Sequence, residues 1–242
     1  MYKFKEPLIE GMILSRPNRF IMMVEVDGKT HEAHSPTTGR IGGLVIKNIP
    51  CLLSVADDPK RRTKYTVEAI SMDQSRPFGW IGINQGRSNR YLENFLEENL
   101  MDKMINVKGK IAREKRLGNS KIDFKVDNCF IEVKTPLMFL DTSGHPNHID
   151  KPLTFSSEDR MVKQFNDMCG ALRDGEKAIS ILFNQYDAPT FDPPKIESPS
   201  VERIKSTVRK ALKIGMESWQ VNAQVTPEGV SLIEYFKLDL DL

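Results

Sequence analysis

The chain has 242 residues, of which 39% are hydrophobic and 28% are charged, and this composition is typical of a folded globular protein rather than a disordered or fibrous one. Its apolar runs fall short of the roughly 18 residues that a membrane span needs, and its polar beginning shows no secretory leader, so we expect a cytoplasmic protein without membrane contact. The three cysteines are widely spaced, which favours reduced packing residues over a disulfide framework or a zinc site.

The first 85 residues contain short runs rich in β-branched, aromatic and other apolar residues, separated by turn signals. One of these signals, Asp27-Gly28, is typical of a tight hairpin. Short strands at even spacing favour a small barrel such as an OB-fold, although an SH3-like barrel or an extension of a following sheet would give a similar pattern. We expect strands at residues 20–26, 30–34, 51–56, 64–71 and 79–84.

From residue 88 onward the hydrophobic pattern acquires a helical period, and Ser88 is expected to cap the first helix. The chain as a whole is therefore predicted to be an α+β protein, with an OB-like β-barrel over residues 1–85 and a mixed α/β domain over residues 86–242. In the second domain we expect helices at 88–100, 157–173 and 201–213, strands within 105–135 and at 178–183, 219–225 and 230–240, a loop at 136–154 and a proline-rich turn at 187–199.

Two short turns in the second domain predict a three-stranded meander with a charged face. If residues 118–119 and 127–128 are the two turns, Glu114 falls opposite Asp123, and Asp123 falls opposite Glu132. Side chains alternate between the faces of a strand, so the three carboxylates are expected in one row. A slip of the register by one residue would destroy this arrangement.

Like charges that face one another across a sheet are unfavourable, so a cation is expected among the three carboxylates. Lysines could supply it, as on many solvated sheet faces, and Lys134 lies beside Glu132 on the same face. The other interpretation is a divalent metal, Mg²⁺ or Mn²⁺, because Mg²⁺ favours one or two carboxylates together with water and substrate oxygens. A metal and a lysine at one site are typical of phosphodiester hydrolysis.

Ile122-Asp123 followed by Glu132-Val133-Lys134 resembles the PD-(D/E)xK nuclease superfamily, and the match extends to a narrower family. The chain resembles the sugar fermentation stimulation protein A (SfsA) family along nearly its whole length. The segments that carry this resemblance are residues 16–20, 33–34, 38–40, 61–65, Asn89, 113–114, 118–124, 132–135 and 211–215.

The resemblance implies an OB-like nucleic-acid-binding domain followed by a PD-(D/E)xK nuclease-like domain. It implies that Asp123 and Glu132 hold the metal, that Lys134 is the catalytic lysine, and that Glu114 is a further acidic site residue. The sequence departs from the family pattern in one helix, where Gln164 stands at the position of a histidine after an apparent insertion at 137–154. This departure puts the rate, the substrate or the mechanism of the family in doubt.

Basic residues in both domains are expected to contact nucleic-acid phosphates, which would give salt-dependent and largely sequence-independent affinity. We therefore expect a metal-dependent nuclease that acts on DNA or RNA, and the sequence is also compatible with a homodimer. The alternative is a non-catalytic DNA-binding regulator linked to sugar-utilisation genes. The predicted phosphate contacts are Arg16, Arg19, Arg40, Lys60, Arg61, Arg62, Lys64, Arg160 and Lys163.

Overall fold

The computed structural model describes residues 1–150, 158–193, 198–240 and 242. Parts of three predicted segments lie outside the described residues: residues 151–154 of the loop at 136–154 and of its insertion, residue 157 of the helix at 157–173, and residues 194–197 of the proline-rich turn at 187–199. In the described part of the chain, the helices are too short or too polar to cross a membrane.

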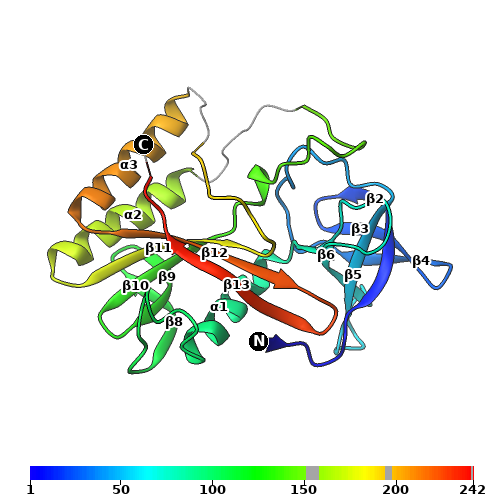
Figure 1. Ribbon diagram of the computed structural model, residues 1–242, viewed down its shortest axis with the longest axis horizontal. Coiled ribbons are helices and arrows are strands. Elements are labelled where there is room, and N and C mark those ends of the chain that lie inside the picture. The colour runs from blue at the N-terminus through cyan, green and yellow to red at the C-terminus, as the bar shows by residue number, and fades with distance from the viewer. Residues whose placement is uncertain (151–157, 194–197, 241) are drawn as a thin grey trace.

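The first half of the chain forms a closed OB-like barrel, on the right in Figure 1. Its strands follow the order β4-β3-β2-β5-β6, and a parallel pairing of β6 with β4 closes the circle. The short strand β7 (Ile81–Gly82) extends the sheet beside β6. The barrel strands are β2 (Ile9–Asn18), β3 (Ile21–Val26), β4 (Lys29–His34), β5 (Ile49–Val55) and β6 (Tyr65–Ile70).

The hairpin between β3 and β4 shows why this sequence forms a barrel wall. Asp27 and Gly28 both have positive φ, 50° and 71°, as the tight hairpin turn requires. Along β3, Met22 and Val24 are buried while Glu25 is exposed, so one face of the strand packs into the barrel core and the other meets solvent.

The second half forms a seven-stranded mixed sheet in the order β1-β13-β12-β11-β10-β9-β8, in which β10, β11 and β12 run parallel. The edge strand β1 (Tyr2–Lys3) comes from the beginning of the chain and pairs with β13, so these residues lie outside the barrel expected over 1–85. The other strands are β8 (Ile111–Leu117), β9 (Ser120–Val126), β10 (Cys129–Lys134), β11 (Lys177–Asn184), β12 (Glu217–Val225) and β13 (Gly229–Lys237).

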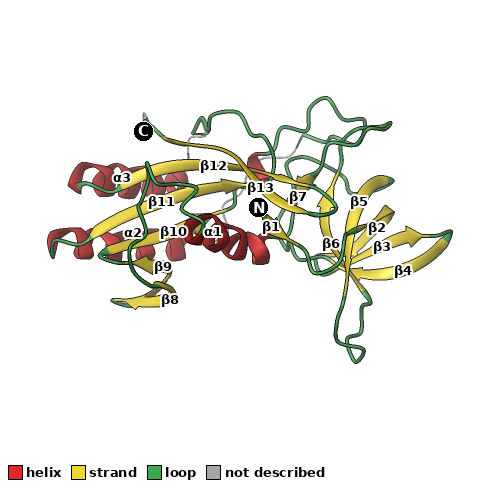
Figure 2. Ribbon diagram, turned by 60° about the horizontal axis from the view of Figure 1, so that its bottom comes forward, coloured by secondary structure: helices red, strands yellow, loops and turns green. Residues whose placement is uncertain are grey.

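Helices cover both faces of this sheet, as Figure 2 shows. Helix α1 (Ser88–Glu97) buries Leu92 and Phe95 in one core cluster with residues of β9 to β13. Helices α2 (Glu158–Arg173) and α3 (Pro199–Ile214) enclose a second cluster on the opposite face. Two short 3₁₀ helices, η1 (Gln85–Arg87) and η2 (Leu137–Phe139), lie in the connections.

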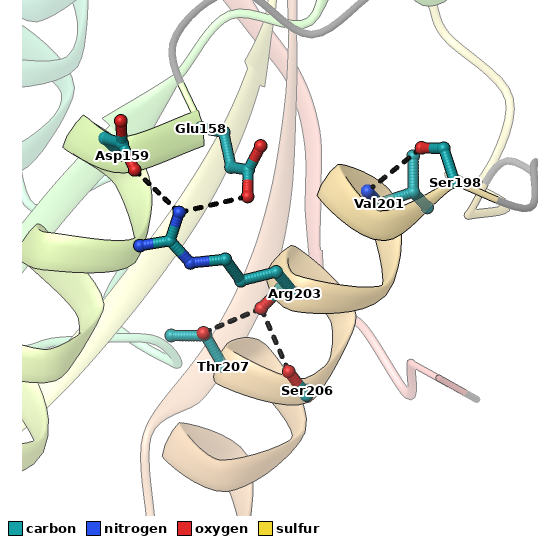
Figure 3. A network of polar contacts seen from close by, with 7 residues as sticks. All are labelled: Glu158, Asp159, Ser198, Val201, Arg203, Ser206 and Thr207. Atoms are coloured by element: carbon teal, nitrogen blue, oxygen red, sulfur yellow. Dashed lines mark hydrogen bonds and ion pairs between the residues drawn. The ribbon is translucent and has the colours of Figure 1, made fainter.

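Arg203 of α3 ties the two helices of the second cluster together. Its Nη1 lies 2.6 Å from Asp159 Oδ1 and 3.2 Å from Glu158 Oε1, both in the first turn of α2 (Figure 3). Ser198 accepts a hydrogen bond from the backbone N–H of Val201 and so caps α3. These contacts link the first turn of α2 to α3, although exposed ion pairs contribute little stability.

The barrel and the sheet meet at Gly82, whose backbone N–H donates to the carbonyl of Gln185 at 2.8 Å. The side-chain amide of Gln185 also donates to Ser88 Oγ at 2.9 Å. The prediction that Ser88 caps α1 was wrong, because Arg87 occupies the cap position and makes no side-chain cap bond. The Ser88 hydroxyl instead accepts from Gln185, the residue that Gly82 of the barrel half contacts.

Candidate active site

The two predicted turns set the register of the meander as expected. Leu117 pairs with Ser120 between β8 and β9, and Val126 pairs with Cys129 between β9 and β10. The ladder between β9 and β10 ends at the pair Ile131 and Phe124. The strands separate beyond this pair, so the predicted pairing of Asp123 with Glu132 is not formed. The carboxylate of Asp123, next to Phe124 where the strands separate, lines a cavity.

Glu114 does not join the other carboxylates, although the strand pairs on either side of it would place it next to Asp123. Its φ of 49° breaks the regular alternation of β8, and its exposed carboxylate pairs with Lys121 at 2.8 Å. The hydrogen bond from Lys121 lowers the pKa of Glu114. The expected row of three carboxylates is therefore not formed, and within the described residues no group of three or more acidic, histidine or cysteine side chains could hold a metal.

Asp123 is held from two directions. Its Oδ2 accepts the backbone N–H of Val133 at 2.8 Å, and its Oδ1 accepts the side-chain amide of Asn89 at 2.9 Å. Asn89 lies in the first turn of α1, whereas Glu93, one turn later, pairs with Arg113 at 3.4 Å. The sequence indicated Asn89 only as part of a family-like motif, so its contact with the carboxylate was not foreseen.

Glu132 is the most buried acid of the site, with 1% of its surface exposed. Its Oε1 accepts from Lys134 Nζ at 2.6 Å, but its Oε2 is buried without a hydrogen-bond partner. Burial raises the pKa of Glu132, and the nearby charge of Asp123 raises it further, while Lys134 acts in the opposite direction. The site therefore holds a carboxylate whose charge is only partly compensated by the protein.

Gln164 of α2 completes the surroundings of Lys134. Its Oε1 accepts from Lys134 Nζ at 2.8 Å, and its Nε2 donates to the backbone carbonyl of Lys121 at 3.2 Å. Both ends of this buried amide are used, so Gln164 fixes the position of the lysine between α2 and the meander. A glutamine cannot exchange a proton near neutral pH as a histidine does.

Asp123, Glu132, Lys134 and Gln164 line one cavity of about 590 Å³, a size typical of small-molecule and cofactor sites. The β-ladders place Ser180 beside Glu132, and Ser218 beside Ser180, and both serines line the cavity. Small side chains in these positions leave the space open. Neither serine was predicted from the sequence as a site residue, because their placement depends on pairing between distant strands.

The structure brings only some of the predicted basic residues to this cavity. Arg160 lies on its wall, whereas the side chain of Lys163 is exposed and does not line it. Arg16, Arg19 and Arg40 line a second cavity. The remaining predicted contacts, Lys60, Arg61, Arg62 and Lys64, are exposed on the barrel near β6, where Arg62 pairs with Glu32 and Lys64 lies over Tyr65.

The fold and the cavity define a two-part protein: an OB-like barrel joined to an α/β domain with a buried carboxylate and a lysine at its centre. Family models match both parts, the SfsA N-terminal OB domain over residues 14–83 and the sugar fermentation stimulation protein RE domain over residues 86–229. The chain belongs to the SfsA family, as its resemblance predicted.

Curated relatives carry the same family name and match the chain along most of its length. A sugar fermentation stimulation protein homolog from Synechococcus elongatus is 28% identical over 239 residues, which cover 97% of this chain and 96% of the relative. A homolog from Geotalea uraniireducens is 30% identical over 233 residues, covering 93% and 94%. The solved structure of Pyrococcus furiosus SfsA in complex with Ca²⁺ is similar in fold, with a TM-score of 0.72 at 18% identity and full coverage of both chains.

Proposed function

We propose that the protein is a metal-dependent nuclease that hydrolyses phosphodiester bonds of DNA or RNA. The observation that carries this proposal is the carboxylate of Glu132, whose Oε2 is buried without a partner in the same cavity as Asp123 and Lys134. A buried charge is costly unless it is fully compensated. Such a group is kept where a cation or a substrate supplies the missing interaction.

The donor set fits Mg²⁺ or Mn²⁺, which prefer oxygen ligands. Glu132 offers its unpartnered oxygen, and each oxygen of Asp123 retains a lone pair beyond the hydrogen bond that it accepts. When bound at these two side chains, the metal would polarise a phosphoryl oxygen and lower the pKa of a bound water. The Pyrococcus furiosus relative was solved with Ca²⁺, another cation that takes oxygen ligands.

The chain's own residues would position and neutralise the substrate. Asn89 holds Asp123 in place, and Gln164 holds Lys134, so neither charged group has to reorganise when a phosphate arrives. Lys134 would stabilise negative charge that develops on the phosphate, and Arg160 at the cavity wall would attract the strand.

The test is incubation of the purified protein with labelled single- and double-stranded DNA and RNA in Mg²⁺, Mn²⁺ or EDTA. We expect cleavage only with metal, and a loss of about 10²- to 10⁴-fold in Asp123→Asn and Lys134→Ala. Matched controls are Glu97→Gln and Lys115→Ala, whose side chains are exposed away from the cavity. Cleavage that persists in Asp123→Asn or Lys134→Ala would contradict the proposed site.

A second candidate function, a DNA-binding regulator, is favoured by Gln164. Both ends of its amide are engaged, and it cannot supply the proton transfer that a histidine at this position offers. Tight, salt-sensitive binding of DNA without cleavage in any of the metals would favour the regulator. A gain of cleavage in Gln164→His would instead assign the inactivity to this one side chain.

A further inference from the structure

A second cavity, which we call the arginine pocket, lies on the barrel where β2 ends and the loop after β4 passes over it. Its volume is about 350 Å³. None of the described residues that line it is acidic. The pocket is lined by Arg16, Asn18, Arg19, Thr38, Gly39, Arg40, Ile41, Gly42, Gly43, Leu44 and Ile149.

Arg16 is built into the wall of the arginine pocket. Its guanidinium donates to the carbonyls of Gly39, Arg19 and Thr37, while its Nε is buried without a partner. Burial lowers the pKa of Arg16, but an arginine remains charged at any physiological pH. Carbonyl oxygens orient the guanidinium without cancelling its charge, so the wall carries a fixed positive charge.

Asn18 and Arg19 add further donors to the arginine pocket. Asn18 Oδ1 accepts the backbone N–H groups of Phe20 and Ile21, at 2.8 and 3.1 Å, so the amide NH₂ is the group left for a ligand. Arg19 lies over the ring of Phe20, 4.7 Å from its centre. Within the described part of the chain, neither Arg16 nor Arg19 pairs with a carboxylate. A pocket of this chemistry selects an oxyanion, and arginine forks match phosphate in particular.

Thr38 lines both the arginine pocket and the cavity of the candidate active site. The two concave sites are therefore adjacent, one on the barrel side and one on the sheet side. A nucleic acid bound to both cavities has to place phosphates in two neighbouring hollows, so its backbone has to follow the protein surface between them. Duplex DNA is stiff, with a persistence length of about 150 base pairs, whereas a single strand bends readily.

We propose that the arginine pocket binds one phosphate of a single-stranded nucleic acid whose next part crosses Thr38 into the catalytic cavity. This inference rests on the proposed function, since it assigns the substrate class of the same site. It makes the pocket an anchor that fixes which phosphodiester reaches Asp123 and Glu132.

The test measures binding without catalysis, by fluorescence anisotropy of a labelled single-stranded oligonucleotide in EDTA. Arg19→Ala and Arg40→Ala should each weaken binding about tenfold and reduce the slope of log K against log salt by about 0.7, the value for one phosphate contact with a single strand. Lys29→Ala, an exposed lysine on the same barrel, should leave both unchanged. Inorganic phosphate should compete with the oligonucleotide on the wild type and lose this effect in Arg40→Ala.

Arg16 is left intact in this test because its bonds to carbonyls hold the loop. The inference would be overturned if both arginine variants kept the wild-type affinity and the wild-type salt slope. It would also be overturned if the wild type did not bind single strands. Equal affinity for a duplex of the same length would overturn the substrate class. If the protein never cleaves but the arginine variants bind single strands more weakly, the phosphate-binding pocket is supported and the nuclease is refuted. Failure of the inference can therefore be distinguished from failure of the proposed function.

Discussion

Replacing the buried acid Glu132 by glutamine should stabilise the protein while it abolishes the proposed metal site. Glu132 is 1% exposed and its Oε2 has no partner, so ionisation at this position opposes folding. Glutamine keeps the shape and still accepts from Lys134, but it leaves a buried amide group unpaired. A buried charge without full compensation costs more than a neutral polar group, by about 1 kcal/mol or more. We therefore expect Glu132→Gln to raise Tm by about 2–4 °C in EDTA at pH 7.5.

The pH dependence of this gain follows from the raised pKa of Glu132. The folded state binds this proton more tightly than the unfolded state does, so the wild type loses stability as pH rises from the usual value of 4.5 through the raised pKa. Thermal unfolding of both proteins between pH 4 and pH 8 measures the difference, which should vanish at the acid end. Added Mg²⁺ should stabilise the wild type alone. A variant less stable than the wild type at pH 7.5, or a difference that does not change with pH, would refute the reasoning.

Three further outcomes are expected. Asn89→Ala removes one hydrogen bond to the carboxylate of Asp123. It should reduce the rate of cleavage about tenfold, which corresponds to a loss of about 1.4 kcal/mol. An unchanged rate would mean that Asn89 does not position this carboxylate. Burial raises the pKa of Cys51 and Cys129 to about 12, so at pH 8 a thiol reagent followed by mass spectrometry should label them only upon unfolding. Gly82→Ala would place a Cβ 2.5 Å from a neighbouring side chain and should cost about 1–3 kcal/mol in urea unfolding, whereas Gly144→Ala, with open space around it, should have little effect.

The turns of the meander explain how much of the site was predictable. Gly118 and Asp127 both adopt positive φ, 54° and 51°, and residues that tolerate this conformation mark such turns in a sequence. Once the turns are placed, the register follows by counting. The pairs on either side of Glu114, Arg113 with Phe124 and Lys115 with Ile122, follow the predicted register, whereas Glu114 itself leaves the ladder.

The direction of a side chain was less predictable. The left-handed backbone of Glu114 turns its carboxylate to Lys121, and a regular strand pattern gives no sign of this break. Asn89 reaches Asp123 from a helix that is distant along the chain, and Ser180 lies beside Glu132 only because β11 runs parallel to β10. Long-range pairing of this kind leaves no local period in the sequence.

The pairing of β1 with β13 has a consequence for the order in which the chain folds. The five strands of the barrel wall, β2 to β6, are all present once Ile70 has been synthesised, and they pair with one another and with the later β7. Tyr2 must wait for Val230, which is synthesised long after the barrel strands. Strand β1 therefore finds its partner only after the strands of both halves have been synthesised, and its docking then adds the edge strand to the seven-stranded sheet.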